Sequence, residues 1–157
     1  MAMIRKASAV RKKLHMLIYG EQGTGKSRTA MQLCYLKNAD GKPFRVLYLD
    51  TENGSIDNYT EELEANGVNP DNLLIVYTQS LAEVQDYIKM VTNDEDIEDE
   101  NGDVYLDADG KPFRADALVV DSASILKMTA TQGLTSFSQK RAKVKAAAQG
   151  LTGDERA

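Results

Sequence analysis

Cysteine is almost absent from this sequence, since Cys34 is the only one among 157 residues. A single thiol excludes an internal disulfide framework and is typical of a protein from a reducing compartment. Because there is also only one histidine, the chain lacks the Cys and His clusters that hold structural zinc. The acidic residues fail the EF-hand order, because no stretch has acids at loop positions 1, 3 and 5 with glycine at position 6. The sequence therefore excludes disulfide-rich, zinc-binding and EF-hand classes.

Long apolar runs are missing as well, and none is long enough to span a bilayer. Residues 1–13 are basic, as in the first part of a signal peptide. The apolar stretch that follows, Leu14–Tyr19, is too short for a signal-peptide core and leads directly into a glycine-rich loop. We therefore expect a cytoplasmic protein with no membrane partner.

The formal net charge is −5, which argues against a general coat for nucleic acid, because such binding depends on basic surface. The charge is uneven along the chain. Basic residues gather near the start and again at residues 140–145, and the segment Asp94–Asp103 between them is strongly acidic. Such charge runs are expected to be solvated faces.

Four short apolar runs with β-branched or aromatic residues indicate strands. They barely alternate in polarity, which suits strands buried on both faces of a parallel sheet. Predicted helices lie between them, and a length of 157 residues fits one domain, 1–157. Strands alternating with helices predict an α/β fold, a three-layer sandwich with a mainly parallel sheet. The predicted strands are Leu14–Tyr19, Val46–Asp50, Leu73–Tyr77 and Leu118–Asp121, and the predicted helices are Lys26–Leu36, Ile56–Ala65 and Leu81–Val91.

Two segments depart from this alternation. Residues 94–116 are predicted to form an inserted acidic loop followed by a β-hairpin. Residues 135–157 form a tail that is helical up to Ala148 and polar after it. The sequence ADGKPFR occurs twice, at Ala39–Arg45 and Ala108–Arg114, each time just before a buried strand. We interpret this repeat as a reused turn.

A glycine-rich motif after the first predicted strand matches G-x-x-x-x-G-K-[ST] at every fixed position. Glycines let successive backbone N–H groups turn inward around phosphates, and the following helix directs its positive end to the same point. The lysine carries its charge to the β and γ phosphates, and the serine hydroxyl is a ligand for Mg²⁺. We predict that nucleotide binds to Gly20, Glu21, Gln22, Gly23, Thr24, Gly25, Lys26, Ser27 and the adjoining Arg28.

The motif is specific, since by chance it is expected in about 1% of chains of this length. Its glycine spacing also argues against the G-x-G-x-x-G of a dinucleotide site. A nucleoside triphosphate, ATP with Mg²⁺, is the ligand predicted by this motif.

Two acids at other strand ends complete the predicted site. Asp121 ends an apolar strand and is placed to hold Mg²⁺ beside the loop. Glu52 follows the strand Val46–Asp50, where it can orient or deprotonate the attacking water. Each has a simpler explanation: Asp121 as a helix cap and Glu52 as a first-turn acid that stabilises the next helix. Position alone leaves the role of Glu52 open.

From Leu14 to Leu126 the chain resembles the RecA-like branch of P-loop ATPases, above all the phage- and prophage-encoded nucleotide-binding proteins of that branch. The resemblance rests on the P-loop, on VLYLDTEN, on NPDNLLIVYTQS at Asn69–Ser80 and on VVDS. It implies that Glu52 is the catalytic glutamate and that Tyr59 lies against the adenine ring. Lys26, through its charge on the phosphates, is the other predicted catalytic residue.

The chain also departs from this family. In RecA-like proteins a further strand follows and inserts between the P-loop strand and the strand of Asp121, and it ends in a residue that senses the γ-phosphate. No such strand is predicted after Leu126, and the DNA-binding loops that follow in recombinases are missing too. We therefore expect a RecA-like domain that is shortened at its C-terminal end.

The resemblance implies an ATPase of phage or prophage DNA metabolism, in recombination or strand annealing, located in the bacterial host cell. Single-stranded DNA, a phage recombination or replication protein, and further copies of the chain are the implied partners. Two alternatives stay open. One is a non-hydrolysing nucleotide-binding or partner-dependent subunit. The other is a small-molecule P-loop kinase, which ranks lower because no arginine-bearing lid is visible.

Overall fold

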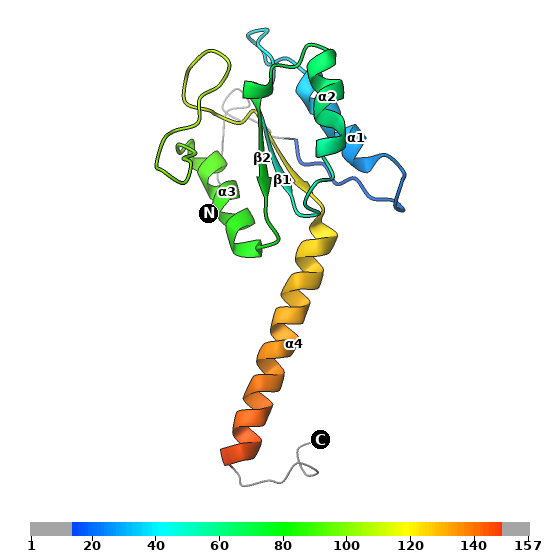
Figure 1. Ribbon diagram of the computed structural model, residues 1–157, viewed down its shortest axis with the longest axis vertical. Helices are drawn as coiled ribbons and strands as arrows, with labels where there is room; N and C mark the ends of the chain where they lie inside the picture. Colours follow the sequence, from blue (N-terminus) through cyan, green and yellow to red (C-terminus); the bar gives the residue numbers. More distant parts are fainter. Residues whose placement is uncertain (1–13, 149–157) are drawn as a thin grey trace, which may run out of the picture.

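The computed structural model describes residues 14–148 and contains a three-stranded parallel sheet (Figure 1). Its strands are β1 (Val46–Asp50), β2 (Leu73–Tyr77) and β3 (Ala117–Asp121), in the order β2-β1-β3. These bounds agree with three of the four predicted strands to within one residue. All five residues of β1 are buried, because this apolar strand lies between the other two.

The helices follow the predicted alternation with the strands. Two differences from the prediction exceed two residues: the first helix changes to a 3-10 helix after Met31, and the last begins at Ala123 instead of Thr135. The elements are α1 (Lys26–Met31), η2 (Gln32–Tyr35), α2 (Asp57–Ala65), η3 (Pro70–Asn72), α3 (Leu81–Asn93) and α4 (Ala123–Ala148).

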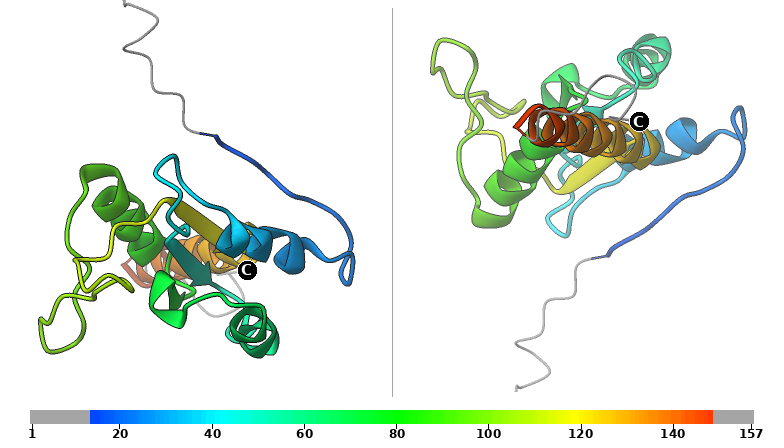
Figure 2. Two further views of the ribbon diagram at one scale, coloured as in Figure 1. Left: turned by 90° about the horizontal axis from the view of Figure 1, so that it is seen from above. Right: turned by 90° about the horizontal axis from the view of Figure 1, so that it is seen from below.

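Helices cover both faces of the sheet, which confirms the three-layer α/β prediction (Figures 1 and 2). Successive strand residues point to opposite faces, so β1 contributes to two apolar clusters. Val46 and Tyr48 pack with residues of α1 and α2, whereas Leu47 and Leu49 pack with α3 and the start of α4. Asp50 follows the same alternation as Tyr48, and therefore belongs to the α1 and α2 face.

The prediction of a strand at Leu14–Tyr19 is wrong for this structure. The segment belongs to no sheet, and Leu14, Leu17 and Tyr19 are each at least 80% exposed. An apolar run becomes a strand only if a neighbouring strand supplies hydrogen-bonding partners. The family resemblance places another strand between this segment and Asp121, but in the described part of the chain α4 follows β3 instead.

The repeated ADGKPFR segments form two equivalent turns, as predicted. In the first, Asn38 Oδ1 accepts hydrogen bonds from the backbone N–H groups two and four residues later, at 3.0 and 3.1 Å. In the second, Asp107 does the same, at 3.0 Å for both. Asp99 in the acidic loop repeats the arrangement at 2.8 and 2.9 Å. The predicted hairpin is limited to one isolated bridge, Leu106 to Pro112.

The last helix, α4, extends away from the sheet (Figure 1). Every side chain from Thr131 to Lys145 is exposed. Among residues 14–148, no helix combines the length and apolar character needed to cross a membrane. The basic cluster before Leu14 and the polar tail Gly150–Ala157 lie outside the described residues.

Candidate nucleotide-binding site

The P-loop forms a tight exposed turn that leads into α1. Gly23 and Gly25 have φ angles of 80° and 82°, in the left-handed region that glycine adopts without a steric cost. The turn is closed by the Thr24 hydroxyl, which donates to the Glu21 carbonyl at 2.8 Å. A side chain at Gly20 would meet this hydroxyl, because a Cβ there would lie 3.0 Å from it. Backbone conformation or close packing therefore explains the glycine at each of these three positions of the loop.

Lys26 folds back over this turn. Its Nζ donates a hydrogen bond to the Glu21 carbonyl oxygen at 2.8 Å, while the side chain stays half-buried. The ammonium group is thus held over the loop by one weak acceptor, which a phosphate oxygen can replace with a stronger, charge-assisted bond. The exposed loop with a cation at its centre is suited to binding an anion.

Glu52 is positioned where β1 and β3 end side by side. Asp50 and Asp121 are register partners, and the Thr51 N–H donates to the Asp121 carbonyl at 2.7 Å. The Thr51 hydroxyl also exchanges two 2.8 Å hydrogen bonds with the backbone of Ser122. Across this junction the Ser122 hydroxyl donates to Glu52 Oε1 at 2.8 Å. The structure therefore brings Glu52 next to the end of the Asp121 strand.

Asp50 holds the loop that carries Glu52. Its buried carboxylate accepts hydrogen bonds from the backbone N–H groups of Glu52 and Gly54, both at 2.9 Å, and of Ile56 at 3.4 Å. Three donors around one carboxylate fix the path of residues 52–56. The side chain of Glu52 remains exposed, so it is available to solvent water on a backbone that cannot shift easily.

The Asp121 carboxylate accepts side-chain hydrogen bonds through only one of its two oxygens. Its Oδ2 accepts a 2.6 Å hydrogen bond from the Tyr48 hydroxyl and a 3.4 Å bond from the Ser55 hydroxyl. Burial and then the bond to Asp121 raise the pKa of Tyr48, whereas the nearby Ser27 and Ser55 hydroxyls oppose this shift. The Tyr48 hydroxyl is therefore bonded to Asp121 and lies near Ser27, the other predicted metal ligand.

These donors fit Mg²⁺. The ion prefers oxygen ligands, keeps several waters, and is commonly held by one carboxylate together with substrate phosphates. The Asp121 carboxylate and Ser27 hydroxyl are oxygen donors beside the P-loop. Among the described residues, no group of three or more His, Cys, Asp and Glu side chains is suited to an ion held by protein alone. The site thus suits a metal that arrives with a nucleotide.

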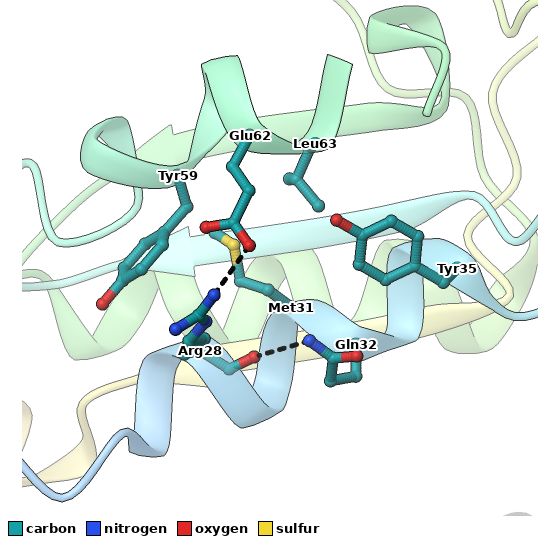
Figure 3. Close-up of a pocket in the computed structure, with 7 residues that line it drawn as sticks. All are labelled: Arg28, Met31, Gln32, Tyr35, Tyr59, Glu62 and Leu63. Carbon is teal, nitrogen blue, oxygen red and sulfur yellow. Dashed lines mark hydrogen bonds and ion pairs between the residues drawn. The ribbon is translucent and has the colours of Figure 1, made fainter. Parts of the chain in front are cut away.

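Arg28 and Tyr59 lie together on the outer side of α1. They line a shallow pocket between α1 and α2, where Arg28 forms an ion pair with Glu62 at 2.8 Å (Figure 3). The hydrogen bond to Glu62 is the main reason that the pKa of Arg28 is raised. Tyr59 lies beside this pair, and Tyr35 stands across the pocket. The structure therefore places these two predicted nucleotide-binding residues together, in the pocket between α1 and α2.

Sequence analysis missed four residues that organise this site: Tyr48, Asp50, Ser55 and Ser122. A signal for Tyr48 existed, because a phenol in an otherwise aliphatic buried strand needs a hydrogen-bond partner. A signal for Asp50 existed too, because a carboxylate at the end of a buried strand also needs hydrogen-bond donors. The serines carried no signal, because only the meeting of the β1 and β3 ends brings them to the two acids.

Comparisons with known proteins agree with the P-loop. A family model described as an AAA domain matches residues 12–152, which is most of the chain. The matched region includes the P-loop, the end of β1 with Glu52, and Asp121 at the end of β3. No curated protein and no solved structure matches the chain.

Proposed function

The chain belongs to the AAA domain family, so it contains a nucleotide-binding P-loop domain, and from this we propose that it is a Mg²⁺-dependent ATPase. The observation that supports hydrolysis is the junction of the β1 and β3 ends. There Glu52, an exposed carboxylate, is held beside the strand end that carries Asp121. A RecA-like and phage origin, and a cytoplasmic place in the host cell, belong to this proposal and rest on the sequence resemblance.

In the proposed reaction the P-loop backbone and Lys26 bind the phosphates of ATP. Ser27 and Asp121 would hold Mg²⁺, which would supply positive charge to the phosphates of the bound nucleotide. Glu52 accepts a proton from the attacking water, and the Ser122 hydroxyl, 2.8 Å from its Oε1, orients the carboxylate. The bond between water oxygen and γ-phosphorus forms as the bond to the ADP oxygen breaks, and inorganic phosphate leaves.

This proposal is tested by measuring ATP binding and phosphate release on one sample, with and without Mg²⁺. Binding and turnover that both need Mg²⁺ would support it. Binding without turnover would favour the alternative of a non-hydrolysing or partner-dependent subunit. Transfer of the γ-phosphate to a small acceptor instead of water would favour the kinase alternative.

We also propose that the adenine ring stacks on Tyr59, beside the Arg28–Glu62 pair. Tyr59→Ala is expected to raise the Kd of ATP by about 2- to 10-fold, because an aromatic contact contributes about 0.5–1.5 kcal/mol. Tyr59→Phe, which keeps the ring, should change it little. Tripolyphosphate, which has no base, should bind all three proteins equally. Calorimetric titration measures these constants, and an equal loss for tripolyphosphate would show that Tyr59 supports the fold instead.

Single-stranded DNA is the partner that we propose for α4. This 26-residue helix contains five basic residues and no acidic one, whereas the chain as a whole has a net charge of −5. Four of the five lie in its exposed distal part: Lys140, Arg141, Lys143 and Lys145. A basic helix that extends from an acidic domain offers phosphates a surface without nearby repulsion. A phage protein partner and assembly into homo-oligomers are further parts of the proposal.

Replacing Lys140 and Lys143 together with glutamine is expected to weaken binding of a labelled single-stranded oligonucleotide. If both contact phosphates, the slope of log K against log salt should become shallower by about 1.4, at about 0.7 per contact. Fluorescence anisotropy at several salt concentrations measures this slope. The matched control replaces Lys89 and Lys111, which are equally exposed but lie outside α4. Equal slopes in the two variants would contradict the role of α4.

A further inference from the structure

Tyr48 is an aromatic residue in the central strand, and its hydroxyl bonds to Asp121, one of the two predicted metal ligands. The side chain is fully buried, and its ring packs in the cluster between the sheet and the helices α1 and α2. Phenylalanine would fill nearly the same volume. Burying the additional hydroxyl of tyrosine costs free energy unless the hydroxyl is hydrogen-bonded. The partners of this hydroxyl therefore indicate why the position holds tyrosine.

The hydroxyl reaches across to the neighbouring strand. Tyr48 is the register partner of Val119, and the two side chains lie in the same cluster on one face of the sheet. Asp121 follows Val119 by two residues, so its side chain points to that face too. The hydroxyl donates to Asp121 Oδ2 at 2.6 Å. Ser55, from the loop after β1, donates to the same oxygen at 3.4 Å. Both hydrogen bonds end on Oδ2, so Oδ1 is the oxygen that Asp121 presents to a ligand.

Ser27, just after the P-loop, lies close enough to the same hydroxyl to lower the pKa of Tyr48. Ser27 is on α1 and Asp121 is at the end of β3, so the two residues are about 94 positions apart in the chain. A single buried side chain therefore bonds one predicted metal ligand and lies near the other. Partners of this kind orient metal ligands and commonly affect metal affinity by about 10- to 100-fold.

We propose that Tyr48 is a positioning residue for nucleotide-bound Mg²⁺: its hydroxyl holds Asp121 Oδ2 in place, and Oδ1 would be the oxygen that Asp121 offers to the ion. This inference rests on the proposed function, because it requires that the chain binds Mg²⁺ with a nucleotide. The inference adds Tyr48, which belongs neither to the P-loop nor to the strand-end acids, to the residues that bind the metal and nucleotide. Tyr48 does not contact the reacting atoms, and it acts through Asp121.

The test is a titration of the purified chain with a fluorescent ATP analogue at a series of Mg²⁺ concentrations. Tyr48→Phe is expected to raise the Mg²⁺ concentration for half-maximal binding by roughly 10-fold. Affinity for the analogue in EDTA should stay within about 2-fold, because the P-loop and Lys26 are unchanged. Tyr87→Phe is the matched control: Tyr87 is half-buried in the cluster on the other face of the sheet.

A double-mutant cycle separates positioning from packing. In an Asp121→Asn background, Tyr48→Phe should change the Mg²⁺ dependence no further, because the carboxylate through which it acts is gone. Urea unfolding reports the fold of each variant. An unaltered Mg²⁺ dependence in Tyr48→Phe, or an equal shift in the Asp121→Asn background, would overturn the proposal. If the native chain shows no Mg²⁺-dependent binding at all, the proposed function itself fails.

Discussion

Replacing Glu52 with glutamine is expected to lower the ATP turnover rate by roughly 100-fold or more while leaving ATP affinity nearly unchanged. Glutamine has the same shape, and its carbonyl can still accept the hydrogen bond from Ser122. It cannot accept a proton from the attacking water, so only the chemical step should be lost. A 100-fold loss corresponds to about 2.7 kcal/mol of transition-state stabilisation.

Single-turnover phosphate release measures this effect, and titration with a fluorescent ATP analogue measures the affinity. Glu61→Gln is the matched control, because Glu61 is an exposed acid on α2. Equal turnover in both variants would show that Glu52 is not the catalytic base. If the native chain shows no ATP turnover, the alternative of a non-hydrolysing subunit is favoured.

Measuring ATP turnover of the native chain with added single-stranded DNA then tests whether the proposed partner stimulates hydrolysis.

Lys26→Ala should have the other large effect, a loss of ATP binding itself. Charge-assisted hydrogen bonds contribute about 1.5–3 kcal/mol, so the Kd of Mg-ATP is expected to rise by about 10- to 100-fold. The fold should be unaffected, because the Nζ group bonds to a single carbonyl of an exposed loop. Calorimetric titration measures the Kd, and circular dichroism during urea unfolding checks the fold.

Lys89→Ala serves as the control for lost positive charge. Lys89 is an exposed residue on α3, where it pairs with Asp86 at 2.9 Å. Lys26→Arg tests a different point, because it keeps the charge while changing its shape and reach. If Lys26→Ala and Lys89→Ala bind Mg-ATP equally well, the P-loop assignment would be contradicted. If only Lys26→Ala fails, nucleotide binding is located at this loop.

Much of the fold follows from local pattern, which sequence analysis can evaluate. The runs that became β1, β2 and β3 are apolar on both faces, and such runs are stable only when covered on both sides. The order of strands and helices then predicts a parallel sheet with helices on each face. Gly23 and Gly25 are equally local, because their left-handed φ angles belong to the loop itself.

The run Leu14–Tyr19 shows the limit of such reasoning. Its composition resembles that of β1, but a strand also needs a partner, and composition says nothing about which edge is free. In this structure no neighbour pairs with it, and its side chains remain exposed.

The length of α4 was missed for a related reason. The helix as a whole carries no strong amphipathic pattern, so its start could not be placed from periodicity.

The candidate site divides in the same way. The sequence by itself determined the phosphate loop and the two strand-end acids, because each depends on residues that are adjacent in the chain. Only the tertiary structure decided that Ser122 holds Glu52 and that Tyr48 holds Asp121. These contacts join residues about 70 positions apart, with separations of 70 and 73. They exist because β1 and β3 pair in register, which places their carboxyl ends side by side.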